Sequence, residues 1–347
     1  MAPFPPDVTV AIVAHNATRY LGACLDSVDA LACPQAQIVV VDVASTDGLR
    51  DWLAARAPGA DYVRLERNDG PSPGRNAGIR HARTKFVLLL DADVQLEPST
   101  LTSLYDAMRD DPTIAIGSPV VVYADRPDVI QYADTWLHFI CEAINPYLDR
   151  PLAERGTDAR DIGVASTCAL LLDRQIAIDI GLFDERYFIG KEDGDFTHRA
   201  KMAGYAILEL PAARVRHMVK PRSTWLFYYQ IRNRWHFLLK NYEWRTLFWL
   251  IPALVVHEIL QFVFLVAKGH GVTWLKALGG LVALLPSLHR DRALMYRIRR
   301  RRDTELLRDG SLVVRQDLAA GLTGRLLRGY EQAISAYWRL LRRTVLR

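Results

Sequence analysis

Blocks of apolar and polar residues alternate along the first two-thirds of the chain. Short apolar runs rich in branched side chains predict strands, and the mixed segments between them predict helices. Strands are expected at 8–14, 37–41, 61–66, 86–90, 113–123, 164–172 and 205–210. Helices are expected at 20–31, 51–56, 75–83, 99–109, 174–181 and 191–204. This rhythm predicts an α/β fold with a mostly parallel sheet and helices on both faces.

Two further segments shape this expectation. Residues 125–161 show no strong period, and their polar residues and prolines predict a long connection over the sheet. Pro211 is expected to end the short strand at 205–210, because proline cannot donate a ladder hydrogen bond.

The last third of the chain has a different pattern. Residues 246–267 are strongly apolar and about long enough to cross a bilayer, whereas 272–286 are apolar but short for a span. Basic and aromatic residues flank both stretches, which predicts helices that lie in, or dip into, a membrane surface. Ordinary core helices and a hairpin through the bilayer are the alternatives.

Charge is unevenly distributed along the chain. The whole sequence carries +5, but residues 287–347 contain fifteen arginines, no lysine and six acids, which leaves −4 for the rest. A basic tail on a slightly acidic body indicates an anionic partner, lipid or nucleic acid, unless it is only a solvated helical face. The apolar segments before the tail favour an anionic membrane surface and no nucleic acid.

Cysteine usage and the N-terminus bear on the compartment. The spacing of Cys24, Cys33, Cys141 and Cys168 is not that of metal ligands, so buried apolar thiols in a reducing compartment are expected. Residues 1–7 contain three prolines and do not form a secretory signal. We therefore expect the protein to stay in the cytoplasm.

The tripeptide Asp91-Ala92-Asp93 is the strongest chemical signal. It follows the apolar run 86–90, at the carboxyl end of a predicted buried strand, where open α/β sheets bind ligands. Residues i and i+2 of an extended chain point the same way, so both carboxylates can face one divalent cation or one phosphorylated ligand. Taken alone, the same tripeptide also fits a turn or a helix N-cap.

Other polar motifs accompany it in a fixed order. They are Val13-Ala14-His15-Asn16, the segment 41–48 with Asp42, Asn68-Asp69-Gly70, Gly74-Arg75-Asn76-Ala77-Gly78, the segment 181–185, Glu192-Asp193-Gly194-Asp195, and His217. This series resembles the family 2 glycosyltransferases with the GT-A fold, over about residues 7–240. Within that family it looks most like bacterial rhamnosyltransferase-type enzymes of cell-surface polysaccharide assembly.

The resemblance implies an inverting, metal-dependent transfer of one sugar from a nucleotide diphosphate sugar. The donor would be dTDP- or UDP-linked, with rhamnose favoured and galactose, glucose and mannose open. The acceptor would be a lipid-linked saccharide at the cytoplasmic face of the inner membrane, with the protein peripheral or re-entrant there. A processive polysaccharide synthase and a catalytically silent nucleotide-sugar-binding scaffold are the alternatives.

The resemblance also assigns a metal centre and a base. Asp93 and His217 would bind Mn²⁺ or Mg²⁺, although a lone histidine after a strand has no such meaning without the other motifs. Asp193 would accept the proton of the acceptor hydroxyl. Glu192 and Asp195 would orient the acceptor or fix the start of the helix.

Donor binding would use a second group of residues. Asp42 would accept a hydrogen bond from a pyrimidine N–H, and Asp47 is interpreted equally as a partner in that role or as the cap of the next helix. Arg75, at a glycine-rich helix start, would bind the diphosphate unless it lies on a solvated face. The remaining donor-binding candidates are Asn16, Asn76 and Asp91, the last near the ribose or the metal.

A domain organisation follows from these motifs. A catalytic domain is expected at 1–221, with a nucleotide-sugar half at about 7–123 and an acceptor half at about 162–221, followed by a helical, basic, membrane-associated region at 222–347. Processive synthases of this superfamily carry Gln-x-x-Arg-Trp, but here one residue too many separates Gln230 from Arg234-Trp235. This departure favours transfer of a single sugar.

Overall fold

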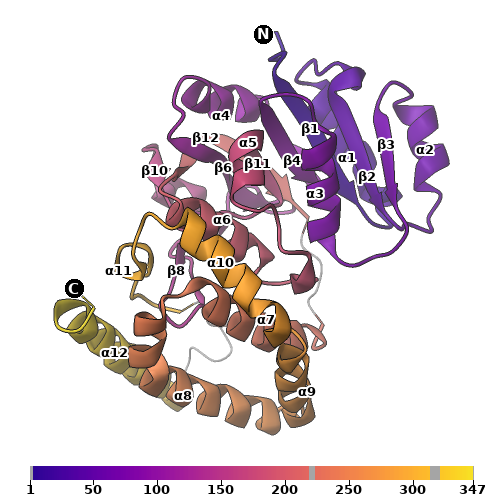
Figure 1. Ribbon diagram of the computed structural model, residues 1–347. Coiled ribbons are helices and arrows are strands. Elements are labelled where there is room, and N and C mark those ends of the chain that lie inside the picture. The colour runs from indigo at the N-terminus through magenta and orange to yellow at the C-terminus, as the bar shows by residue number, and fades with distance from the viewer. Residues whose placement is uncertain (1–2, 219–222, 313–320, 347) are drawn as a thin grey trace.

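A mixed ten-stranded sheet forms the centre of the molecule (Figure 1). The computed structural model describes residues 3–218, 223–312 and 321–346. The main path runs β10-β12-β6-β11-β4-β1-β2-β3, with β5 paired to β12 and β7 to β6. The strands are β1 (Val8–Ala14), β2 (Ile38–Val43), β3 (Asp61–Leu65), β4 (Phe86–Asp91), β5 (Val94–Leu96), β6 (Ile114–Tyr123), β7 (Ile130–Tyr132), β10 (Arg160–Asp161), β11 (Ala169–Asp173) and β12 (Ala206–His217).

Strands β1 to β4 are parallel to one another, in line with the predicted mostly parallel sheet. β1 pairs in parallel with β2 and β4, and β2 pairs in parallel with β3. β11 is antiparallel to both β4 and β6, which makes the sheet mixed. The carboxyl ends of β1, β2 and β4 therefore meet at one edge, where polar side chains from different motifs can converge.

Helices cover both faces of the sheet, as the sequence pattern predicts. Alternate residues of β1 enter two different cores: Val10 and Ile12 face one, and Ala11 and Val13 the other. The first core is closed by α1 (Thr18–Asp29), α2 (Leu49–Arg56) and α4 (Thr100–Met108). The second is closed by α3 (Pro71–His81), α5 (Arg174–Asp179), α6 (Glu192–Met202) and α10 (Leu288–Ile298).

Two sequence-based expectations, about the end of the strand at 205–210 and about the segment 125–161, were wrong. β12 does not stop at Pro211 but continues to His217, because the register against β6 shifts between Leu210 and Arg214. Such a bulge tolerates a proline that a regular ladder would exclude. The segment 125–161 is more than a connection: it contributes β7, β10 and the hairpin of β8 (Trp136–Leu137) and β9 (Ala143–Ile144).

The C-terminal region is helical and packs against the catalytic half. Its helices besides α10 are α7 (Leu226–Asn241), α8 (Trp244–Ala267), α9 (Gly271–Val282), α11 (Asp303–Leu306) and α12 (Gly321–Arg343). Short 3₁₀ turns occur at Gln35–Gln37, Leu152–Arg155, Glu185–Tyr187 and Leu285–Ser287. Figure 1 shows α7, α8 and α9 on the side of the molecule away from β1–β3.

The two regions share buried contacts, so the C-terminal helices are not a loose appendage. Lys240 of α7 reaches Asp184 at 2.8 Å and Asp195 of α6 at 3.0 Å, all three largely buried. Trp338 of α12 is fully buried and stacks on Phe139, with ring centroids 5.0 Å apart. The expected boundary at 221/222 lies outside the described residues.

Helix α8 is apolar on both faces. Leu247, Leu250 and Leu254 face the protein, whereas Ile251, Ile259 and other large apolar side chains of the opposite face are exposed. By length and composition, Trp244–Ala267 and Gly271–Ile298 are the segments, among those the structure describes, that could cross a membrane. An exposed apolar face of this size is typical of a surface that contacts a membrane or another protein.

The four cysteines are all buried and free, as expected from their spacing. Burial raises the pKa of the Cys141 thiol to about 12, so this side chain behaves as a small apolar group.

Replacing Trp338 by alanine should destabilise the whole protein, because the stacked ring fills a core shared by α12 and the segment around Phe139. A loss of about 3–5 kcal/mol is expected, measured by denaturant unfolding. Leu340→Ala is the control, since Leu340 lies on the same helix but is exposed. Equal stability of the two variants would contradict the shared core.

Candidate functional site

Asp91 ends β4 at the edge where the parallel strands meet. Its two carboxylate oxygens each accept a hydrogen bond from Nη2 of Arg75 at 3.0 Å. Burial raises the pKa of Asp91, and the adjacent guanidinium opposes that rise. Asp91 is thus held by a protein cation at the centre of the site.

Arg75 reaches this position because α3 lies unusually close to the sheet. A Cβ on Gly74 would come within 2.7 Å of Val13 and 2.8 Å of Val43, and one on Gly78 within 2.9 Å of Ala11. Only glycine fits at these distances, so the helix can approach the strand ends. The side chain of Arg75 is then buried at the same edge as the carboxylate of Asp91.

The guanidinium of Arg75 also joins the two halves of the domain. Its Nη1 lies 3.5 Å from Asp193 and 3.7 Å from Glu192, both in the first turn of α6. The sequence predicted that Arg75 binds the diphosphate. The structure instead places the guanidinium among the carboxyl groups of Asp91, Glu192 and Asp193, which already neutralise its charge. Although burial opposes the rise, the negative charges of these neighbours raise the pKa of Arg75.

Glu192 is the most perturbed acid of this cluster. It is buried, and burial, then the charge of Asp193, raise its pKa from 4.5 to about 8, with Arg75 opposing. Glu192 is therefore largely protonated near neutral pH. When Glu192 is neutral, the positive charge of Arg75 faces only the two negative charges of Asp91 and Asp193.

Asp193 is held by a residue that the motifs do not reveal. The hydroxyl of the fully buried Thr167 donates a short hydrogen bond to Oδ1 of Asp193, and the Thr167 amide lies 3.4 Å from Oδ2. The Asp193 side chain is still 35% exposed. A carboxylate that is oriented yet accessible has the geometry that a general base requires.

Side chains of α7 hold the loop before α6 in place through hydrogen bonds to its backbone. Asn233 donates from Nδ2 to the backbone oxygens of Tyr187 at 2.7 Å and Gly190 at 2.7 Å, and Arg232 donates to the oxygen of Arg186 at 2.6 Å. The start of α6, and with it Asp193, is thus positioned from the C-terminal region.

Asp93 and His217 face each other across paired strands. β12 pairs with β5 so that His217 lies opposite Val94, and the amide of Met218 donates to the backbone oxygen of Asp93 at 3.1 Å. Nε2 of His217 is 3.7 Å from Oδ1 of Asp93. The family resemblance assigned these two residues, which are far apart in the sequence, to one metal centre, and the structure places their side chains side by side.

This pair fits a divalent cation. Two donor atoms 3.7 Å apart can both lie about 2.1 Å from one ion. No cluster of three His, Cys, Asp or Glu side chains with metal-ligand geometry occurs within residues 3–218, 223–312 and 321–346. A hard cation held by one or two protein groups completes its shell with substrate phosphates and water.

Asp42 is less accessible than its predicted role requires. It is fully buried, and its carboxylate accepts hydrogen bonds from the Ser45 amide at 2.7 Å, the Tyr62 hydroxyl at 2.5 Å and Arg64 at 2.5 Å. These partners lower its pKa although burial opposes them. Arg64, whose side chain is 39% exposed, is the accessible member of this group.

The two asparagines differ in their settings. Asn16 is exposed, and its side-chain oxygen accepts from the Thr46 amide at 2.8 Å, which joins the ends of β1 and β2. Asn76 is buried and bonds the backbone of Phe183 through both ends of its amide. Asn76 therefore fixes the 183–185 loop, and both ends of its amide are engaged there.

Two acids serve as structural supports. Asp195 is fully buried and contacts Arg199 at 2.9 Å, Lys240 and Asn241. Of the two roles expected for it, fixing the helix is the one its burial permits. Asp47 caps a helix, but that helix is α1 rather than the following one: its carboxylate accepts from the amide of Thr18 at 3.0 Å.

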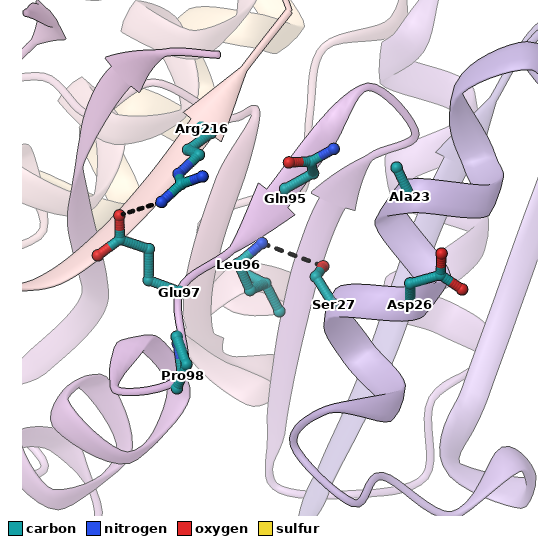
Figure 2. Close-up of a pocket in the computed structure, with 8 residues that line it drawn as sticks. All are labelled: Ala23, Asp26, Ser27, Gln95, Leu96, Glu97, Pro98 and Arg216. Atoms are coloured by element: carbon teal, nitrogen blue, oxygen red, sulfur yellow. Dashed lines mark hydrogen bonds and ion pairs between the residues drawn. The ribbon is translucent and has the colours of Figure 1, made fainter. Parts of the chain in front are cut away.

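A surface hollow of about 340 Å³ lies between α1 and β5, away from this cluster. Figure 2 shows Arg216 paired there with Glu97, and the Leu96 amide bonded to Ser27. Arg216 alternates with His217 along β12, so it points to the opposite face of the strand. The hollow thus lies on the face of β12 opposite His217, and it is not a candidate for the reaction.

Residues 9–180 match the sequence model of the family described as Glycosyl transferase family 2. The chain belongs to glycosyltransferase family 2. Its fold is that of GT-A glycosyltransferases, and it superposes on the crystal structure of GalNAc-T7 with UDP, GalNAc and Mn²⁺ with a TM-score of 0.54. That likeness covers 68% of this chain and 48% of the other at 17% identity.

Two relatives of this glycosyltransferase indicate its setting. The succinoglycan biosynthesis protein ExoO of Rhizobium meliloti is 32% identical over 40% of this chain and 38% of its own length. The N-acetylglucosaminyl-diphospho-decaprenol L-rhamnosyltransferase of Mycobacterium tuberculosis is 24% identical over 60% of this chain and 75% of its own length. The chain thus matches less than half of ExoO and three quarters of the mycobacterial protein.

Glu192 provides a test of the cluster. The folded protein keeps the Glu192 proton up to pH about 8, whereas the unfolded chain loses it near 4.5. The folded state binds more protons in this window, so stability falls as pH rises through it, by at most about 1.4 kcal/mol per pH unit.

Glu192→Gln should not lose stability in this way as the pH rises, because glutamine has no proton to release. The unfolding midpoint of the variant, relative to wild type, should rise steadily between pH 5 and pH 8. Glu66→Gln, at an exposed position, serves as the control. A constant difference between Glu192→Gln and wild type across this range would contradict the buried, protonated carboxyl.

Proposed function

We propose that this protein transfers a single sugar, with inversion, from a nucleoside diphosphate sugar to a hydroxyl of a lipid-linked saccharide in cell-surface polysaccharide synthesis. The observation that carries the proposal is the convergence of Asp91, Asp193 and Glu192 on Arg75, beside the pair of Asp93 and His217. The names of the ExoO and mycobacterial relatives support the setting and the lipid-linked acceptor.

In the proposed reaction Asp193 accepts the acceptor proton as the hydroxyl oxygen attacks the anomeric carbon. The bond from that carbon to the diphosphate oxygen breaks on the opposite side, so one displacement inverts the centre. Asp93 and His217 would hold Mn²⁺ or Mg²⁺, which when bound neutralises charge on the departing diphosphate. Arg75 keeps Asp91 and Asp193 in fixed positions throughout.

A uridine or thymidine diphosphate is the donor we favour, and rhamnose is the favoured sugar. UDP in the GalNAc-T7 structure and the rhamnosyltransferase relative support these choices. The base would lie at the ends of β2 and β3, where Arg64 can donate to pyrimidine carbonyl oxygens and Asp42 holds Arg64 in place.

We further propose that α8 lies along the cytoplasmic face of the inner membrane. Its inner face is fixed to the protein: the Glu258 carboxylate pairs with Arg234 and accepts from Trp235 at 2.8 Å and Trp274 at 2.9 Å. α12 lies beside it, with the Tyr337 hydroxyl bonded to the backbone oxygen of Trp249 at 2.6 Å. A helix anchored on one side in this way favours a peripheral or re-entrant position over a span.

Asp193→Asn should lower turnover at least a hundredfold, because the amide cannot accept the proton. Binding of UDP with Mn²⁺ should stay within about twofold, measured by isothermal titration. Asp110→Asn, at an exposed carboxylate paired with Arg109, is the control. Retained turnover in Asp193→Asn would overturn the base assignment and favour the scaffold alternative.

Substituting both Val255 and Ile259 by asparagine should weaken binding to anionic vesicles at least tenfold. Each substitution removes about 1–2 kcal/mol of the favourable free energy of transferring an apolar side chain from water to the membrane. Both residues are exposed, so the buried face of α8 is unchanged. Flotation with phosphatidylglycerol vesicles measures the effect, and Ala54→Asn, at an exposed position of α2, is the control. Equal flotation of all three proteins would rule out α8 as the contact.

A further inference from the structure

Gln131 contacts His217 from a strand that the sequence pattern did not reveal. Its side chain is almost fully buried, and Oε1 lies 2.8 Å from Nδ1 of His217. The other ring nitrogen of His217, Nε2, faces Oδ1 of Asp93. One imidazole therefore connects a buried amide to the proposed cation site.

A β-bulge aims Gln131 at the histidine. In the antiparallel pair of β6 and β7, Val121 lies opposite Tyr132, but Val122 lies opposite Ile130. Gln131 is the extra residue of this register shift, and such residues are commonly re-aimed out of the regular ladder. β12 pairs with the other edge of β6, where His217 lies opposite Tyr123.

The bulge is itself held in place. The side-chain amide of Asn145 donates to the backbone oxygen of Gln131 at 2.8 Å, and Asn145 is also buried. The position of the Gln131 side chain is thus set by the pairing of β6 with β7 and by the hydrogen bond from Asn145.

A carbonyl oxygen can only accept a hydrogen bond, so Nδ1 of His217 must carry the proton that Gln131 accepts. In the neutral imidazole the other nitrogen, Nε2, then has its lone pair directed at the Asp93 side. Histidines that bind metals are oriented in this way by an acceptor on the far ring nitrogen.

We propose that Gln131 is a positioning residue of the cation site, which fixes the tautomer and the ring orientation of His217. This role rests on the proposed function, because it requires that Asp93 and His217 hold a divalent cation. Gln131 acts only through His217 and does not contact the substrate.

Manganese binding tests the role without measuring turnover. Free Mn²⁺ is followed by electron paramagnetic resonance during titration of the full chain in the presence of UDP. Gln131→Leu, which keeps the size but loses the acceptor, should weaken Mn²⁺ binding about 10–100-fold. Gln131→Glu keeps an acceptor oxygen and should bind Mn²⁺ at least as tightly as wild type.

Gln95→Leu is the matched control. Gln95 lies on β5 opposite Arg216, on the face of the sheet away from His217, and lines the hollow in Figure 2. Its Mn²⁺ affinity should equal that of wild type. Thermal unfolding of each variant checks folding, and Gln131→Met replaces Gln131→Leu if the latter does not fold.

The outcomes separate this inference from the function on which it rests. Equal Mn²⁺ affinity of wild type and Gln131→Leu would overturn the positioning role alone. Failure of the wild type to bind Mn²⁺ would overturn the cation site and the positioning role together. Weaker binding in Gln131→Leu that Gln131→Glu restores supports the assignment, because a merely structural defect would not be rescued by the acceptor.

Discussion

The buried guanidinium of Arg75 is the interaction on which the site depends. It links Asp91 at the end of β4 to Glu192 and Asp193 in the first turn of α6, more than a hundred residues along the chain. Removing one partner of such a buried pair leaves an uncompensated charge, which is more costly than the pair itself is stabilising. The close approach of α3 that Gly74 and Gly78 permit is therefore a condition for the whole arrangement.

Much of this site could be predicted from the sequence, for a definite reason. Parallel strands meet at one edge, so motifs at strand ends converge wherever the loops run. That rule predicted that the end of β4, with Asp91, lies beside the ends of β1 and β2, as the strand pairing shows, and the family resemblance brought in His217. The sequence pattern did not predict that β12 continues past Pro211. A β-bulge depends on the pairing with the partner strand, here β6, and not on the strand preference of the residues themselves.

The residues missed by sequence reasoning are those that act through single contacts. Thr167 and Gln131 lie in segments with no motif, and their importance comes only from what they touch. Conversely, Asn76 and Asp195 belong to motifs, but their side chains are buried in structural hydrogen bonds, which for Asp195 agrees with the helix-fixing role among the two expected. A motif marks a position in the chain, whereas burial and partners decide whether the side chain is available to a ligand.

Electrostatics connects these observations to the proposed chemistry. Asp91, Asp93 and Asp193 gather at one strand edge, and the Arg75 charge is already shared among carboxylates there. A nucleoside diphosphate would bring further negative charge into the same space, and like charges at such separations repel strongly. If Asp93 and His217 hold a divalent cation, as we propose, its charge would reduce that repulsion. Within the proposed function, the carboxylates that include the base Asp193 would thus also give the cation its role in donor binding.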